Sequence, residues 1–308
     1  MASAPAAQPG AMRGIGPTLP PRVKAAATRA QSAWWLARSR GRLDLKGLRI
    51  LFYHRVSADE DALAVAPRRF REQMELIATA GWHVVDLCEA VDLLLAGHSV
   101  HRTIALNFDD GYRDVAENAL PVLERLGFPA TVFVATGVTD GTASFAWYRR
   151  QPPLLTWEEI VALDRGGTLR FGAHTITHPN LLALQDESAR HEIAGSKLAL
   201  EAKLGREVEA FCYPAGLFSD RDRSFVADAG FRLAVSCEPG VNRPWTDPLA
   251  LHRRQIDARD SLLDFRAKLG GGHDSPLPLR GAYRRLRYGE RKPKGSHRPA
   301  MSGRASPT

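Results

Sequence analysis

The sequence predicts an α/β fold in which a parallel sheet, covered by helices, closes into a distorted (β/α) barrel. Short β-rich runs alternate with helical patterns from Leu48 onward, and this alternation is typical of parallel sheets. The chain has 308 residues, enough for one barrel domain of more than about 200 residues. Apolar residues make up 44% of the chain, which supplies a large core and excludes global disorder.

Each element of this fold is predicted from its own residue pattern. Strands are expected where β-branched and aromatic residues gather, and helices where apolar residues recur every three to four positions. A capping box, Thr156–Glu159, opens one short helix, and Gly205 ends a long one. The expected strands are 48–53, 82–87, 103–108, 130–135, 169–174, 210–214 and 233–237, and the expected helices besides the short one are 70–80, 90–95, 115–126, 187–204 and 221–229.

The chain is expected to divide into a basic, partly helical N-terminal extension, 1–45, a barrel domain, 46–272, and a basic tail, 273–308, without fixed structure. Within the extension, residues 23–40 have a helical pattern and carry Trp34 and Trp35 beside several arginines. Such a helix suits an anionic membrane surface. The alternative, which we favour, is that it docks its tryptophans on the barrel domain.

The formal net charge of +8 lies in the two ends of the chain. Residues 1–47 carry +7 and residues 280–308 carry +8, so subtracting both from +8 leaves −7 for the segment between them. An acidic body argues against nucleic acid as the partner of the folded domain, and the sequence contains no nucleic-acid-reading motif.

The sequence also bears on cell location. Its three cysteines are too few and too scattered for a disulfide framework, which favours a reducing compartment. No apolar run approaches the length of a membrane span, and the first residues lack the apolar core of a secretory signal. We therefore expect a cytoplasmic protein, with peripheral membrane contact through the basic N-terminus as an option.

Two adjacent carboxylates, Asp109 and Asp110, follow the expected strand 103–108 and precede a glycine. Chemistry in barrels of this kind gathers at the carboxyl ends of the strands. One carboxylate there can bind a cation while its neighbour accepts a proton from water. A solvated Asp-Asp-Gly turn is the alternative that this pair alone leaves open.

Two histidines, His174 and His178, stand four residues apart at the end of another β-rich run. Pro179 disfavours helical geometry at His178, so a turn that converges both rings is predicted. Two histidines and one carboxylate are a recurring ligand set for catalytic zinc or non-haem iron. Partly buried structural histidines are the alternative.

Two further segments close expected strands. In Ala210–Gly216 (AFCYPAG), backbone N–H groups of the final turn could face a cavity, or the turn could be an ordinary one. His54, between Tyr53 and Arg55, is either a general acid, because histidine titrates in the useful range, or a surface histidine.

At these residues the chain resembles the polysaccharide deacetylase family, also called carbohydrate esterase family four, from about residue 50 to residue 256. The segment 107–111, NFDDG, is similar to the family's Thr-Phe-Asp-Asp-Gly element, with Asn107 in place of threonine. The segment 174–178, HTITH, is similar to its His-Ser/Thr-x-x-His element. The resemblance implies a barrel of the polysaccharide-deacetylase type with fewer than eight strands, a divalent metal, and hydrolysis of N- or O-acetyl groups on sugars.

Carried over by position, the resemblance implies Asp109 as the general base and Asp110, His174 and His178 as metal ligands. Zinc is the expected metal, although cobalt, nickel and iron also suit this ligand set. The metal would acidify the attacking water and polarise the acetyl carbonyl. The resemblance places the backbone amide that shares the developing oxyanion at Ala215.

AFCYPAG departs from the family's Arg-x-Pro-Tyr-Gly element, because Cys212 stands where arginine is usual and Ala215 where tyrosine is usual. The lost side chains leave the orientation of the base open, whereas the backbone amide can survive the exchange, so the oxyanion role is less affected than the pKa of Asp109. The opening ILFYHRV, with 70–74 and Gly81-Trp82, is similar to the branch containing poly-N-acetylglucosamine deacetylases, whose elements are permuted. That branch implies His54 as the general acid, with His252 in LALHRR as its rival.

The sequence thus predicts a metal-dependent hydrolase that removes N-acetyl groups from a carbohydrate, either a glycan or a lipid-linked amino sugar. Its expected partner is the N-acetylated sugar or polysaccharide itself. A hydrolase of a non-sugar amide is one alternative, because the same residues attack any accessible carbonyl. A catalytically inactive carbohydrate-binding homologue is the other.

Overall fold

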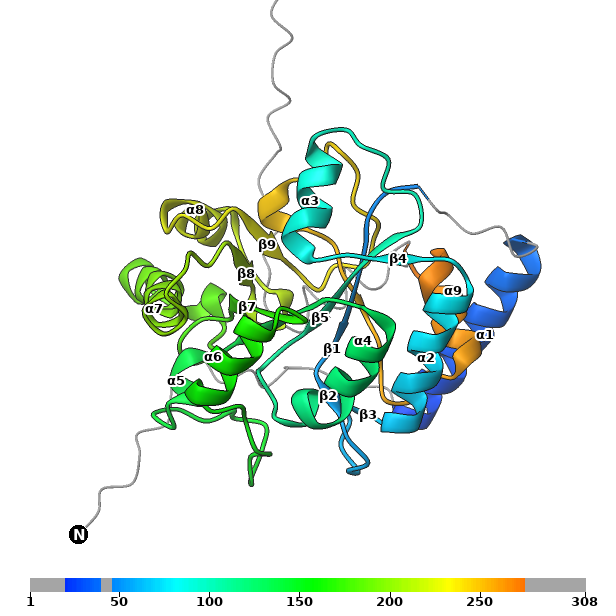
Figure 1. Cartoon of the computed structure of the whole chain (residues 1–308), viewed down its shortest axis with the longest axis horizontal. Helices are drawn as coiled ribbons and strands as arrows, with labels where there is room; N and C mark the ends of the chain where they lie inside the picture. Colours follow the sequence, from blue (N-terminus) through cyan, green and yellow to red (C-terminus); the bar gives the residue numbers. More distant parts are fainter. Residues whose placement is uncertain (1–19, 40–45, 275–308) are drawn as a thin grey trace, which may run out of the picture. The chain divides into compact units, whose positions relative to one another are not determined.

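The computed structural model describes residues 20–39 and 46–274, which contain the whole predicted barrel domain up to its last residue (Figure 1). Most of the predicted tail and the first part of the predicted N-terminal extension lie outside the described residues. None of the described helices is both long enough and apolar enough to cross a membrane.

Parallel strands form the main sheet, in the order β10-β1-β5-β6-β7-β8-β9, and the short strand β4 (His83–Val84) pairs with β5 outside this path. A parallel bridge from Val235 to Leu251 links β9 to the segment that leads into β10, so the sheet curls back toward its own beginning. The predicted barrel of parallel strands is confirmed. Its strands are β1 (Arg49–Tyr53), β5 (Thr103–Phe108), β6 (Ala130–Val134), β7 (Leu169–Ala173), β8 (Ala210–Cys212), β9 (Leu233–Val235) and β10 (Arg254–Gln255).

Helices follow most strands and cover the sheet (Figure 1). The capping box predicted at Thr156 is present and begins α6, and two more, at Ser219 and Ser261, begin α8 and α9. Gly205 ends α7 with a left-handed φ of 67°. The helices of the barrel are α2 (Pro67–Thr79), α3 (Leu87–Leu95), α4 (Leu120–Leu126), α5 (Thr136–Thr139), α6 (Trp157–Gly166), α7 (Asp186–Leu204), α8 (Asp220–Asp228) and α9 (Leu262–Gly270).

The N-terminal helix α1 (Pro21–Ser39) packs against α9 (Figure 1). The buried Ser32 hydroxyl lies 2.7 Å from a carboxylate oxygen of Asp264, at the start of α9. Trp35 lies directly over Gly272, where an added Cβ would meet the indole at 2.7 Å. Trp34, by contrast, is 62% exposed. The helix therefore docks through one of its two tryptophans and leaves the other facing solvent.

The core lies on both sides of the sheet, because the central strands are covered on both faces. All six residues of β5 and all five of β1 and β6 are buried. A small pair, β2 (Arg55–Val56) with β3 (Ala64–Val65), follows β1 at the carboxyl edge. These buried strands hold the polar residues that come directly after them in place.

Candidate active site

The carboxyl edge of the sheet gathers nearly all the residues singled out in the sequence. Parallel strands point the same way, so the residues that follow them meet at one edge. The ladder itself holds two of these residues, because the N–H of Asp109 donates to Tyr53 O and that of His174 to Val134 O, both at 2.9 Å. The residues at this edge are His54 after β1, Asp109 and Asp110 after β5, His174 and His178 after β7, and Ala215 after β8.

Asp110, His174 and His178 form a compact group of potential ligands. The Nε2 atoms of His174 and His178 lie 3.6 and 3.7 Å from Asp110 Oδ1. One ligand atom from each residue lies within 4.8 Å of the other two. Ligand atoms bonded to one zinc-like ion at about 2.0–2.2 Å stand roughly 3.4 Å apart, so this spacing suits a single divalent cation.

The environment of Asp110 also fits a cation. Its Oδ1 is buried and has no hydrogen-bond partner among the described residues, an arrangement that costs free energy. Burial and the neighbouring charge of Asp109 raise the pKa of Asp110 well above its usual value. A positive ion between the three side chains would offset both effects. The residues present therefore fit a divalent metal.

The hydrogen bonding of His174 leaves its Nε2 atom available to a metal. Its Nδ1 lies 2.7 Å from the carbonyl oxygen of Cys212, so Nδ1 carries the proton that it donates there and Nε2 faces Asp110. Burial lowers the pKa of His174 to about 4 and that of His178 well below its usual value. Both rings are therefore neutral at pH 7, as metal ligands must be.

The loop that carries the two histidines is a turn rather than a helix, as predicted from Pro179. Thr175 and His178 have positive φ values of 65° and 58°, which non-glycine residues adopt at a cost of about 1 kcal/mol or more each. Glu192 of α7 holds this loop, because its carboxylate accepts the backbone N–H groups of Ile176 and Thr177, each at 2.8 Å. These hydrogen bonds stabilise the strained conformation of the loop.

The other carboxylate, Asp109, is held by an arginine that the sequence analysis did not identify. Arg253 Nη1 and Nη2 donate to the two Asp109 oxygens at 2.7 and 2.8 Å, in the two-pronged geometry of strong guanidinium–carboxylate pairs. The Arg253 side chain is fully buried, lies 4.1 Å over the Phe52 ring and donates Nε to Ser236 O. Burial would raise the pKa of Asp109, but Arg253 lowers it to about 2.

Arg253 lies where the arginine missing from AFCYPAG would act. Its Nη2 is 3.0 Å from Cys212 Sγ, so the small thiol at 212 leaves room for a guanidinium that arrives from the segment before β10. Arg253 therefore holds Asp109 although residue 212 is not an arginine. The available signal was the arginine next to His252 in LALHRR, but a single arginine there has no pattern that distinguishes it from a surface residue.

The structure separates the two candidate acids. Burial lowers the pKa of His54, and the charges of Asp109 and Arg253 both act on it, which places His54 in the site. The charge that acts on His252 is that of Asp274, whose partner Arg49 begins β1 at the opposite end from His54. Neighbours in an extended segment point to opposite sides, so Arg253 faces the site and His252 does not.

Ala215 lies in the short turn Pro214–Gly216 that follows β8, and it is exposed at the carboxyl edge of the sheet. Its φ of 51° is left-handed, and Gly216 donates its N–H to Tyr213 O at 2.8 Å to close the turn. Successive backbone N–H groups in a turn conformation can form an anion-binding concavity.

Comparison with known proteins agrees with this geometry. A family profile for polysaccharide deacetylase matches residues 96–234. YxkH of Bacillus subtilis, which is named for the same family, is 27% identical over 210 residues, covering 68% of this chain and 71% of YxkH. A poly-beta-1,6-N-acetyl-D-glucosamine N-deacetylase of Staphylococcus aureus is 22% identical over 63% of this chain and 68% of its own length.

Solved structures match as well. IcaB from Ammonifex degensii superposes with a TM-score of 0.65 and 27% sequence identity, covering 73% of this chain and 97% of IcaB. The family profile match, residues 96–234, includes the strands that carry the two aspartates and the two histidines. On the fold, the site and these relatives together, residues 96–234 match the polysaccharide deacetylase family, and the chain is a carbohydrate deacetylase.

Proposed function

We propose that this enzyme removes N-acetyl groups from an amino sugar in a glycan or a lipid-linked saccharide, using a divalent metal and Asp109 as general base. The observation that carries the proposal is that two adjacent carboxylates have different surroundings. Asp110 faces two neutral histidines, whereas Asp109 is held outside that group by Arg253. One position suits a cation and the other a proton acceptor.

Asp109 would take the proton of the attacking water. With a pKa of about 2 it is ionised at neutral pH. Each carboxylate oxygen can accept more than one hydrogen bond, so both oxygens remain available while Arg253 holds them. The two-pronged contact restricts the direction of the carboxylate, and such positioning lowers the barrier when the reacting atoms meet at about 3–3.5 Å.

His54 and Ala215 would complete the reaction. His54 would donate a proton to the departing amine, because an amine that is not protonated is a poor leaving group. The backbone N–H of Ala215 would donate to the oxygen that becomes negative as water attacks the acetyl carbon. Both residues follow strands of the same sheet, at the edge that carries Asp109, which supports these roles.

The metal would be held by Asp110, His174 and His178. When bound, it supplies a positive charge that polarises the acetyl carbonyl and acidifies water. We propose zinc, because two histidines and one carboxylate with an open position are a recurring catalytic zinc set. Cobalt, nickel and iron suit the same ligands and are alternatives for the physiological metal.

The substrate is proposed from the relatives. The S. aureus relative is named for poly-beta-1,6-N-acetyl-D-glucosamine, so an N-acetylhexosamine chain is the first substrate to try. A non-sugar amide remains the second candidate for the same catalytic set, and sugar binding without turnover the third.

The test is acetate release from a panel of N-acetylated monosaccharides and oligosaccharides, with zinc added or chelated. Wild type would be compared with Asp109→Asn and with Asp228→Asn, a matched change at an exposed aspartate of α8. Metal-dependent release that is lost only in Asp109→Asn is expected. Release unaffected by chelation would contradict the metal, and silence on all sugars with turnover of small amides would favour the second candidate.

Location is a separate proposal. We propose that the protein acts in the cytoplasm beside the membrane, supported by the exposed Trp34 on α1 with Arg38 close to its ring. Aromatic and basic side chains together favour anionic lipid surfaces. Fractionation of cells that express wild type or Trp34→Ala tests it, and equal membrane association of the two would contradict a role for this tryptophan.

A further inference from the structure

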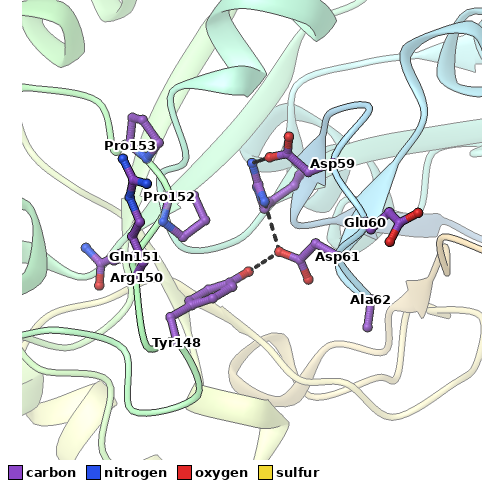
Figure 2. A pocket seen from close by; sticks show the side chains of 10 residues that line it. Asp59, Glu60, Asp61, Ala62, Tyr148, Arg150, Gln151, Pro152 and Pro153 are labelled. Atoms are coloured by element: carbon purple, nitrogen blue, oxygen red, sulfur yellow. Dashed lines mark hydrogen bonds and ion pairs between the residues drawn. The ribbon is translucent and has the colours of Figure 1, made fainter.

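A cavity opens at the same edge of the sheet as the proposed catalytic residues. Its volume is about 580 Å³, within the range of about 300–1,000 Å³ typical of small-ligand sites. Figure 2 shows two loops on either side of it, one between β2 and β3 with Asp59, Glu60 and Asp61, and the other between α5 and α6 with Tyr148 and Arg150 to Pro153. The known site residues are not part of its lining.

The wall after β1 has more negative than positive charge. The buried Arg55 is in contact with three carboxylates, donating to Asp61 at 2.9 Å and to Asp114 at 2.8 Å and pairing also with Asp59. Of these carboxylates, Asp59 and Asp61 line the cavity, and Glu60 adds a third, which is exposed and has no partner within the described ranges. Arg55 and Arg150 are the two cationic residues of the lining, so its formal net charge is −1.

The Tyr148 ring extends from its own loop toward Asp61 of the other loop (Figure 2). Its hydroxyl donates to Asp61, and this contact orients the ring. Tyrosine combines an apolar face with a polar tip, a combination that suits the apolar C–H face and polar hydroxyl groups of a sugar ring. The cavity thus offers a platform, hydrogen-bond acceptors and negative charge to one ligand.

The cavity adjoins the catalytic residues through aromatic contacts. The Tyr148 ring lies 6.1 Å from Trp147, whose ring lies 5.0 Å from that of His178. On the other side, burial lowers the pKa of His54, and Asp61 is among the carboxylates whose charge opposes that effect. A saccharide with one unit at His178 and His54 therefore has the cavity beside it.

We propose that this cavity is a subsite for a hexosamine with a free, protonated amine, next to the N-acetylated unit at the metal site. The inference rests on the proposed function, because deacetylation itself produces such an amine. An acidic cavity attracts the cationic sugar and gives no such advantage to the neutral N-acetylated one. The enzyme would then prefer chains that are already partly deacetylated.

Binding is the first test, because a fully deacetylated glucosamine tetramer cannot be turned over. Titration calorimetry with the metal-loaded enzyme would compare wild type, Glu60→Gln and Glu60→Lys, with Glu124→Gln on α4 as the matched change at an exposed glutamate. Weakening of about two- to fivefold is expected for Glu60→Gln, and more for Glu60→Lys, as for single exposed charge pairs. Raising the ionic strength should weaken wild-type binding too.

The platform is tested by a second pair of variants. Tyr148→Ala should weaken tetramer binding more than Tyr148→Phe, which keeps the ring and loses only the hydrogen bond to Asp61. Dissociation constants that are equal in all variants, or equal for the glucosamine and N-acetylglucosamine tetramers, would overturn the subsite.

Kinetics separates this inference from the proposed function. A lower KM for a partly deacetylated hexamer than for the fully acetylated one, with the difference reduced in Glu60→Lys, supports the subsite. Acetate release with the same KM for both hexamers sinks the subsite and leaves the deacetylase standing. Selective binding of the glucosamine tetramer, without release of acetate from any sugar, would support the cavity as a site for cationic sugars and would contradict the proposed function.

Discussion

Replacing Arg253 with methionine is expected to raise the pKa of Asp109 and to impair catalysis. Methionine keeps much of the length and the apolar packing of the side chain against Phe52 but removes both hydrogen bonds to the carboxylate. Burial alone raises the pKa of Asp109, and Arg253 is the largest influence that opposes it. Without Arg253 the pKa should therefore exceed the usual 3.8 instead of lying at about 2.

The size of the effect follows from these values. A change from about 2 to 3.8 or above corresponds to at least about 2 kcal/mol of lost preference for the ionised carboxylate. Because only the ionised form can accept a proton, activity at acid pH should fall in the variant. Loss of orientation adds a further reduction of about 10²-fold in kcat/KM at neutral pH, the usual cost of a misplaced catalytic group.

The assay is the pH dependence of kcat/KM for acetate release between about pH 4 and 9, with both proteins loaded with the same metal. Wild type should show no decline that belongs to Asp109 in this range, whereas Arg253→Met should lose activity toward its acid end. Arg253→Lys should be intermediate, because an ammonium keeps the charge without the two parallel hydrogen bonds. A wild-type profile and rate in Arg253→Met would refute the reasoning.

Folding must be controlled, since removing one partner of a buried ion pair costs about 3–5 kcal/mol. Calorimetry identifies variants that are unfolded at the assay temperature. A second substitution offers a rescue: Cys212→Arg in the Arg253→Met background returns an arginine at the position where the family usually has one, into space that Arg253 vacates. Recovery of the pH profile would show that the guanidinium itself matters, wherever in the chain it originates.

Further outcomes are expected. His54→Ala should lower kcat/KM for an N-acetyl sugar by about 10²–10⁴-fold, whereas His252→Ala should retain wild-type turnover; equal losses in the acetate assay would contradict the assignment of the acid. Gly216→Ala should lower the melting temperature by calorimetry, because φ is +66° and the new Cβ would lie 2.2 Å from a backbone nitrogen; Gly141→Ala, with φ +72° and open space, is the control. The metal-free protein should lose stability as the pH falls below about 6.5, because the pKa values of His174 and His178 are lowered in the folded state and the unfolded chain binds more protons at both. These two histidines outnumber Asp110, whose raised pKa acts in the opposite direction; a constant melting temperature from pH 7.5 to 5 would argue against the prediction.

Local patterns account for the parts of the fold that were predicted. Strands β1, β5, β6 and β7 begin and end within one or two residues of the expected runs, because each is a short apolar run bounded by turn residues. The expected strand 82–87 is reduced to β4, which is only His83–Val84. Strand β10 and helix α9 were not predicted. β10 has two residues, Arg254 and Gln255, and no alternating pattern marks it.

The group of potential metal ligands, Asp110, His174 and His178, was predicted for the same local reason. Asp109 and Asp110 are adjacent, and His174 and His178 are four positions apart, so each pair can be recognised within a few residues of sequence. That the two pairs meet depends only on both following parallel strands of one sheet. The order of the strands, with β6 between β5 and β7, was not needed to expect their proximity.

The sequence by itself thus determined the α/β class and the aspartate and histidine pairs, because periodicity, turns and capping act over a few neighbouring residues. Only the tertiary structure decided that Arg253 pairs with Asp109 across 144 residues of chain, and that the charges of Asp109 and Arg253 act on His54 whereas that of Asp274 acts on His252. It also decided that two loops enclose an acidic cavity beside that site. The physical reason is that such contacts depend on how the sheet curls, which brings the segment before β10 beside β9 and its side chains into the barrel.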